Sequence, residues 1–314
     1  GRERDAEVAL TGRPVLATGP HQHTTVGHPG GQLVGADIHL HPRERVERPL
    51  GQCAFQSRNT REPLHHQVSA PQTSWGHRVL GRLTLAGDER VIDAGCGSGR
   101  LTAALAERLP RGHVVALDRS WNMLIVARTN LRPVFGPRVS FVQASLPDLP
   151  VAGWADVVFS TATFHWIADH PALFVSLHRA LASGGRLHAQ CGGGPNLATA
   201  HALAEQVMRE APFAPYFADW TGVWQFASAE TTARRLAEAG FVDIDAHLEE
   251  APTTLASADD YRAFVTTVIY HPHLAALPDA LHAPFIDAVA ARAAATAPPF
   301  TLDYWRLNMT ARRR

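Results

Sequence analysis

The chain has 314 residues, of which 46% are hydrophobic and 18% charged, so it can bury a sizeable core and is not a largely disordered protein. Its 29 basic residues, all of them arginine, balance 29 acidic ones, which leaves no basic surplus of the kind that attracts nucleic acid. The cysteines Cys53, Cys96 and Cys191 lie far apart. This spacing predicts neither a disulfide framework nor a metal site.

No apolar run approaches the roughly 18 residues that a membrane span requires, and the first residues lack the apolar core of a signal peptide. We therefore expect a soluble, cytoplasmic protein, either a monomer or a homodimer. We expect no membrane partner and no nucleic-acid partner.

Residues 1–66 are rich in His, Arg, Pro and Gly and show no sustained helical or strand period. We expect this extension to have little order. Its histidines could form a metal-binding tail, but they lack a ligand-like spacing, so we predict no metal site. Translation of GC-rich DNA in a shifted reading frame would also give a sequence rich in these residues and without a hydrophobic period. We therefore hypothesise that residues 1–66 are not native. The folded domain is expected at 67–314.

The folded domain begins with a predicted helix around Trp75 to Leu83, followed by the stretch VIDAGCGSG at 91–99. Val91 and Ile92 suit the end of a buried parallel strand, and the alternating glycines permit a tight turn and close approach to a ligand. A helix should follow from 101 to 109, and then a strand at 114–117 that ends in Asp118. An acid at that position suits hydrogen bonds from a ribose diol, so we predict a ligand site at the carboxyl ends of these strands.

The strand and helix alternation continues along the chain. We expect a helix after Ser120, a strand at 139–142, a strand from Asp156 to Phe159, a helix from Pro171 and a strand at 186–191. This alternation predicts an α/β fold, a mostly parallel sheet with helices on both faces.

Between about 192 and 227 the alternation breaks, and aromatic and proline residues become dense. We predict a small helical lid over an apolar pocket, with His201 or Arg209 available to anchor an acid. The aromatic residues that could form the wall of this pocket are Phe213, Tyr216, Phe217, Trp220, Trp224 and Phe226. A capped helix at 228–240, a strand at 241–248 and helices near 258–270 and 279–295 should follow. Residues 300–309 are expected to return as a final antiparallel strand.

The stretches DAGCGSG and ALDRSWNML resemble the first two motifs of class I S-adenosylmethionine-dependent methyltransferases. A dinucleotide-binding fingerprint would place a glycine at position 100, where this chain has Arg100. The stretches FHWIADH, RLHAQCGG and LDYWRLN resemble the group related to trans-aconitate methyltransferase, whose members methylate small carboxylic acids. The resemblance covers roughly 67–314 and implies a Rossmann-like fold with a seven-stranded sheet and a helical lid.

The resemblance also implies a site for S-adenosyl-L-methionine. Asp93 would hold the ammonium group of the methionine part, and Asp118 would bind the ribose hydroxyls. In the family an acid commonly follows the third strand, whereas this chain has Ala144 and Ser145, so adenine would be bound by weaker groups. The predicted cofactor-binding residues are Asp93, Gly95, Cys96, Gly97, Gly99, Asp118, Arg119, Met123, Ala144, Ser145, Leu146, Ser160 and Thr161.

His165 follows the fourth strand and is the candidate catalytic residue. It would act as a general base if the acceptor is a hydroxyl or an amine, and it would only orient a carboxylate, which is already ionised. The predicted activity is methyl transfer to a carboxylate, hydroxyl or amine of a small metabolite. The alternatives are a non-catalytic protein that binds S-adenosylmethionine and, less favoured, an NAD-type enzyme of the same fold class.

Overall fold

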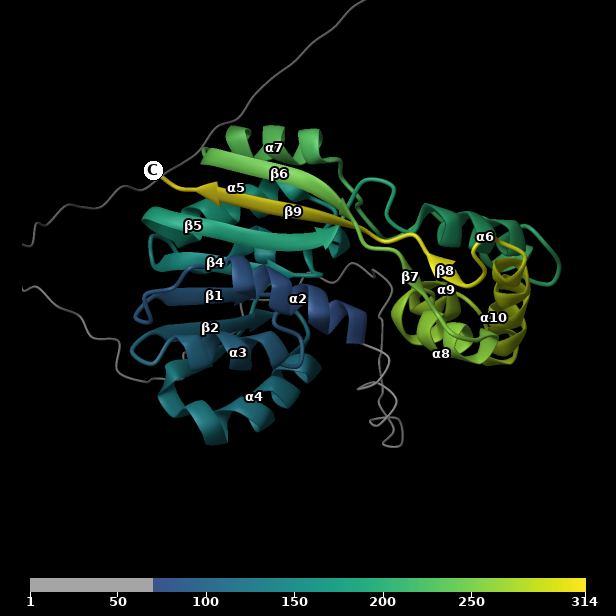
Figure 1. Cartoon of the computed structure of the whole chain (residues 1–314), viewed down its shortest axis with the longest axis horizontal. Coiled ribbons are helices and arrows are strands. Elements are labelled where there is room, and N and C mark those ends of the chain that lie inside the picture. Colours follow the sequence, from purple (N-terminus) through teal and green to yellow (C-terminus); the bar gives the residue numbers. More distant parts are fainter. Residues whose placement is uncertain (1–69) are drawn as a thin grey trace, which may run out of the picture. The chain divides into compact units, whose positions relative to one another are not determined.

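The computed structural model describes residues 70–314; the predicted extension at 1–66 lies outside the described residues. One seven-stranded sheet has the order β3-β2-β1-β4-β5-β9-β6 (Figure 1). All neighbouring pairs are parallel except those that β9 makes with β5 and β6. The strands are β1 Arg90–Ala94, β2 His113–Asp118, β3 Val139–Gln143, β4 Ala155–Thr161, β5 Leu181–Gly192, β6 Val242–Glu250 and β9 Trp305–Arg312.

Helices cover both faces of the sheet, as the βα alternation predicts. On one face, α2 (Ala70–Arg82), α3 (Arg100–Arg108) and α4 (Trp121–Phe135) enclose a hydrophobic core that includes Val91 and Val114. On the other face, α5 (His170–Ala180) and α7 (Ala229–Glu238) enclose a core around Ile92 and Leu187. The predicted Rossmann-like fold class is confirmed.

A separate helical layer lies beyond the carboxyl ends of the parallel strands (Figure 1). We call it the cap. It consists of α6 (Ala198–Met208), α8 (Ala258–Val268), α9 (His271–Ala275), α10 (Asp279–Ala294) and the two-stranded ribbon of β7 (Thr253–Thr254) and β8 (Thr301–Leu302). These segments share one hydrophobic core, in which Tyr261, Tyr270 and Phe285 are fully buried.

The cap is larger than the lid predicted at 192–227, because the helices after β6 pack against α6 in the same core. Two further differences concern strands. The predicted final strand at 300–309 is two strands, since β8 pairs with β7 in the cap and β9 pairs with β5 and β6 in the sheet. β5 begins at Leu181, before the strand predicted at 186–191, and it contains a bulge where the register with β4 shifts between Ala155 and Val157.

Candidate active site

The glycine-rich turn between β1 and α3 is fixed by its backbone. The amides of Gly95 and Cys96 both donate to the carbonyl of Leu117, at 2.8 and 2.9 Å, which ties the turn to the end of β2. Gly95 has φ +85°, and a Cβ there would meet the side chain of Thr163 at 2.2 Å. A Cβ at Gly97 would meet no atom within 4 Å. Gly95 therefore has no room for a side chain, because Thr163 occupies that space, whereas Gly97 faces open space.

Asp118 ends β2 beside this turn, as predicted. Its carboxylate accepts hydrogen bonds from the amides of Gly97 at 2.9 Å and of Ser120 at 2.8 Å. One amide binds each oxygen, so the carboxylate is held in a fixed orientation at the open side of the turn. Because each oxygen keeps a free lone pair, the group can still accept bonds from a pair of ligand hydroxyls.

Asp93 is buried at the end of β1, with an exposed fraction of 3%. Thr102, in the first turn of α3, donates its hydroxyl to Asp93 at 2.6 Å. Burial raises the pKa of Asp93 to about 7, and no cation of the described residues pairs with it. A buried carboxylate of this kind is stabilised by an incoming cation, so the position fits the ammonium group of the cofactor.

The residues at the turn fit S-adenosylmethionine in kind and in place: an acid for an ammonium group, an oriented acid for a diol, and open backbone between them. Cys96 is half-buried next to the turn, and burial raises the pKa of its thiol. Arg119 and Met123 are exposed just after β2; Ser145 is exposed and Leu146 buried just after β3. The assignment of these side chains to the cofactor stays a prediction.

At the end of β4, hydroxyl groups bind neighbouring backbone carbonyls, and the assignment of Ser160 and Thr161 to the cofactor stays a prediction. Ser160 is buried and donates its hydroxyl to the carbonyl of Ala94 at 2.6 Å, so in this structure the hydroxyl links β4 to β1. Thr163 donates to the carbonyl of Thr161 at 2.9 Å and packs against Gly95. Sequence reasoning missed Thr163 and Thr102, because their contacts with Gly95 and Asp93 depend on how the turn after β1 is folded.

His165 lies between the sheet and the cap, in the short helical turn after β4. Its Nδ1 accepts a hydrogen bond from the amide of Gly192, the last residue of β5, at 3.3 Å. Burial and the charge of Arg306 lower the pKa of His165 to about 3. The imidazole is therefore neutral at physiological pH, and its proton is on Nε2 because Nδ1 acts as the acceptor.

A pocket of about 370 Å³ lies in the cap. Phe226 lines this pocket, and its ring centre is 5.8 Å from that of His165. The predicted aromatic wall is formed in part, since Phe217, Trp220, Trp224 and Phe226 line the pocket with His201 and Arg209. Phe213 instead packs in the cap core, and Tyr216 is 45% exposed.

Arg306, on β9, is the most informative residue that sequence reasoning missed. It is 4% exposed, although it is a cation in the core of the sheet. Its Nε donates to Gln190 on β5 at 3.4 Å, and its guanidinium carbon lies 4.7 Å from the centre of the Trp75 ring on α2. The available signal was an arginine between the apolar residues Trp305 and Leu307 in the final strand.

In the described part of the chain, no group of three or more His, Cys, Asp or Glu is arranged to hold a metal ion. Within 70–314 there is also no helix with the length and apolar character needed to cross a bilayer.

The sheet order with β9 antiparallel between β5 and β6, and the paired acids at the ends of β1 and β2, define a class I methyltransferase. A dinucleotide-binding fold would continue in parallel in the order 3-2-1-4-5-6. The family model for a methyltransferase domain matches residues 91–185. Among solved structures, phosphoethanolamine N-methyltransferase 2 of Haemonchus contortus has a TM-score of 0.53 at 18% identity, covering 80% of this chain and 56% of that one. The YcgJ protein of Bacillus subtilis has a TM-score of 0.51 at 16% identity, covering 80% and 99%.

Curated relatives name the family more narrowly. A trans-aconitate 2-methyltransferase of Azoarcus sp. is 34% identical over 231 residues, which cover 70% of this chain and 84% of the relative. One from Acidovorax ebreus is 35% identical over 127 residues, 40% of this chain, and the match spans about half of that relative, 47%. The chain belongs to the trans-aconitate 2-methyltransferase family of S-adenosylmethionine-dependent methyltransferases.

Proposed function

We propose that this protein transfers a methyl group from S-adenosylmethionine to a carboxylate oxygen of a small organic acid. The names of the relatives, trans-aconitate 2-methyltransferases, support an acid as the acceptor. The proposal rests on one observation: His165 is neutral, and its Nδ1 already accepts a hydrogen bond.

His165 is poorly suited to remove a proton. Its Nδ1 already accepts a bond from Gly192, and the pKa of about 3 means that it holds a second proton only weakly. A hydroxyl or amine acceptor must lose a proton during methylation and is helped by a base with a pKa near 7. A carboxylate is already ionised and needs only to be oriented. The Nε2 proton of a neutral His165 can donate to one of its oxygens.

When bound, S-adenosylmethionine supplies a methyl group on a positively charged sulfur, and the acceptor oxygen takes that carbon as the carbon–sulfur bond breaks and leaves its electron pair on sulfur. The acceptor loses its negative charge and the sulfur its positive charge, so no proton is released. Asp93 and Asp118 would hold the two ends of the cofactor, and the cap would exclude water from between the two charges. Positioning and desolvation of this kind are the main requirements of the reaction.

The test is incubation of the protein with S-adenosylmethionine and a panel of organic acids, with product detection by mass spectrometry. We expect a product that carries one additional methyl group and that mild alkali hydrolyses to methanol, as an ester. In weak buffer with a pH indicator, the methyl transfer should release no proton. A methylated product that resists alkali, formed with proton release, would show a hydroxyl or amine acceptor instead. Cofactor binding without any product would favour the non-catalytic alternative.

A further inference from the structure

Among residues 70–314, Arg306 is a buried cation without a buried counterion. Its terminal amino groups have no hydrogen-bond partner among residues 70–314, and it forms no ion pair with a described carboxylate; its contacts are Gln190 and the ring of Trp75. Burial lowers the pKa of Arg306 from its usual value, which reflects the cost of enclosing the charge. A buried guanidinium is normally paired, because an unpaired buried charge is strongly unfavourable. The terminal nitrogens of this guanidinium, which have no partner among residues 70–314, are therefore positioned to bind an anion.

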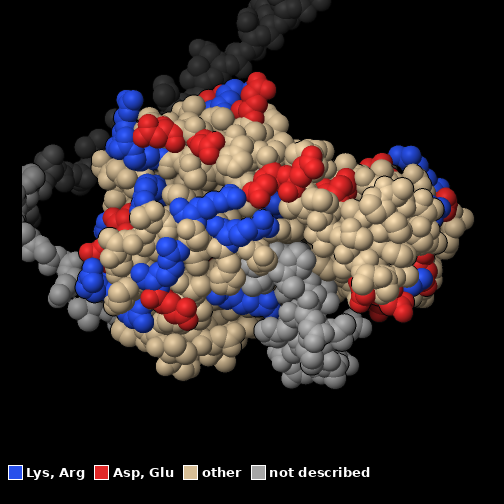
Figure 2. Space-filling view, viewed as in Figure 1, with Lys and Arg blue, Asp and Glu red and all other residues tan. Residues whose placement is uncertain are grey.

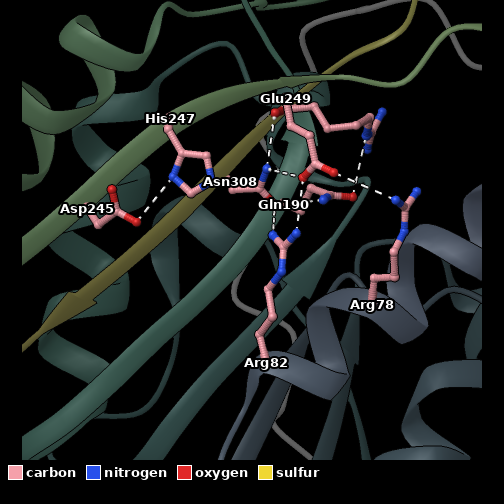
Figure 3. Close-up of polar contacts among 8 residues, drawn as sticks. Arg78, Arg82, Gln190, Asp245, His247, Glu249 and Asn308 are labelled. Atoms are coloured by element: carbon pink, nitrogen blue, oxygen red, sulfur yellow. Dashed lines mark hydrogen bonds and ion pairs between the residues drawn. The ribbon is translucent and has the colours of Figure 1, made fainter.

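The carboxylate that could have paired with Arg306 is already engaged. Glu249 on β6 is bound by Arg82 at 3.2 Å and by Arg78 at 3.6 Å, both from α2 (Figure 3). Asn308 donates to the same carboxylate at 3.2 Å and accepts from Gln190 at 2.7 Å. This chain of bonds turns the amide oxygen of Gln190 toward Arg306. The network thus positions the guanidinium and gives its outer nitrogens no partner within the described part of the chain.

Arg306 lies on the acceptor side of the site. In the register of β5 and β9 it is directly opposite Gly192, whose amide binds His165. Between β9 and β1, which carries Asp93, lie β5 and β4. Three strand spacings correspond to about 14 Å, so the guanidinium is well separated from the position expected for the cofactor ammonium group.

A second unpartnered polar group lies next to Arg306. Tyr304 is 4% exposed, and its hydroxyl has no hydrogen-bond partner within the described residues. Its ring packs edge-on against Trp75, with ring centres 4.9 Å apart, and Trp75 is the same ring that underlies the guanidinium. A free guanidinium and a free hydroxyl in one buried place match the oxygens of a carboxylate.

Building on the proposed function, we propose that Arg306 binds a carboxylate of the acceptor other than the one that is methylated. A guanidinium that engages both oxygens of a carboxylate withdraws charge from each of them, which makes that group a poor nucleophile. The reacting carboxylate is instead the one next to His165. Two separate contacts, Arg306 and the Nε2 proton of His165, require at least two acid groups on one substrate.

The test is calorimetric titration of trans-aconitate into the protein saturated with S-adenosylhomocysteine, so that binding is measured without turnover. Arg306→Gln should weaken trans-aconitate binding roughly 10- to 150-fold, the range for losing hydrogen bonds to a charged group. The affinity of Arg306→Lys for trans-aconitate should lie between those of the wild type and Arg306→Gln. Lysine keeps the positive charge but cannot donate two parallel hydrogen bonds to a carboxylate. The matched control is Arg78→Gln, which removes the same charge from the half-exposed α2 partner of Glu249 and should change binding about twofold or less. The affinity for S-adenosylhomocysteine should stay the same in every variant.

Several outcomes would overturn the proposal: unchanged trans-aconitate affinity in Arg306→Gln, equal losses of acid and S-adenosylhomocysteine affinity, or no binding of trans-aconitate to the wild type. If Arg306→Gln does not fold, the wild type decides, since it should bind the triacid and not its triamide; equal affinity for both contradicts the proposal.

The same measurements separate this proposal from the proposed function. Arginine-dependent acid binding without ester formation from S-adenosylmethionine would refute only the activity. Ester formation with the same KM in wild type and Arg306→Gln would refute only the role of Arg306. With an active wild type, a monocarboxylic acid methylated as efficiently as trans-aconitate would also refute it.

Discussion

At the scale of single residues, the two acids of the cofactor site have different surroundings and should bind ligand in different ways. Asp118 is half-buried and held by two backbone amides, whereas Asp93 is enclosed with one hydroxyl donor. The sequence predicted both positions, because each acid ends an apolar strand. It did not predict Thr102 or Arg306, whose roles depend on contacts across the fold.

We predict that the affinity for S-adenosylhomocysteine rises with pH through about 7. The pKa of Asp93 is raised to about 7, so the free protein holds a proton there at pH 6 and has largely lost it at pH 8. Only the ionised form pairs with the ammonium group of the ligand, so the dissociation constant should fall about tenfold between pH 6 and 8. Calorimetry across this range measures the effect.

The contrasting variants are Asp93→Asn and Asp118→Ala. Asp93→Asn should bind more weakly and without this pH dependence. Asp118→Ala should lose about 1–3 kcal/mol of binding free energy and keep the pH dependence, because it removes only the partner of the hydroxyls. A wild-type affinity that is constant from pH 6 to 8 would contradict the role given to Asp93.

At the scale of elements, local signals predicted the helices and strands well. Ser228 caps α7 by accepting a bond from the amide of Thr231 at 3.1 Å, and Gly240 follows the helix with φ +95°, both as expected from the residue types. What local signals could not give is how the strands pair. The packing of the cap decides that β7 pairs with β8 and that the chain breaks between β8 and β9. The residue pattern of 300–309 alone therefore predicted one continuous strand.

The cap of α7 gives a prediction at this scale. Ser228→Ala should destabilise the protein by about 1 kcal/mol, because one amide at the start of α7 loses its acceptor. Thermal or urea unfolding measures the change. Ser183→Ala, at an exposed position in the bulge of β5, is the control and should change the free energy of unfolding by less than about 0.5 kcal/mol. Equal effects of the two substitutions would show that the Ser228 hydroxyl does not stabilise the helix.

At the scale of the whole molecule, ionic and aromatic groups are distributed unevenly. Arginines gather over α2 and the neighbouring strands, with acidic side chains beside them where β6 passes, while much of the cap surface in view is uncharged (Figure 2). Inside the cap, His273 is 2% exposed and is surrounded by aromatic rings, including those of Trp220 and Phe285. Neutral histidines are therefore buried both beside the sheet, at His165, and inside the cap, at His273.

These histidines should make the protein sensitive to acid. Burial lowers the pKa of His165 and of His273 to about 3 and that of His188 to about 4. The unfolded chain takes up these protons near pH 6.5, so the stabilisation is complete above that value and is lost progressively as pH falls toward 3. Asp93 acts in the opposite sense, because its raised pKa favours the folded state in acid, but the histidines with a lowered pKa outnumber it.

We predict that His273→Phe reduces this acid sensitivity. At pH 5 the wild type should lose up to about 2 kcal/mol of unfolding free energy through His273, and the variant should keep it. Urea unfolding at pH 7 and at pH 5 measures the difference. His77→Phe, on the exposed side of α2, should lose as much stability in acid as the wild type does. If His273→Phe also loses as much, His273 is not a source of the acid sensitivity.

The position of β9 has a consequence for how the protein is made. Of the seven strands, β9 comes last in the sequence, yet it lies between β5 and β6 and carries Arg306. During synthesis β5 and β6 therefore emerge from the ribosome with open edges, which are prone to pair with other chains. The residue that we propose to recognise the acceptor is added in the same step that closes the sheet. A nascent chain stalled before β9 would have its cofactor turn already synthesised and its acceptor site incomplete.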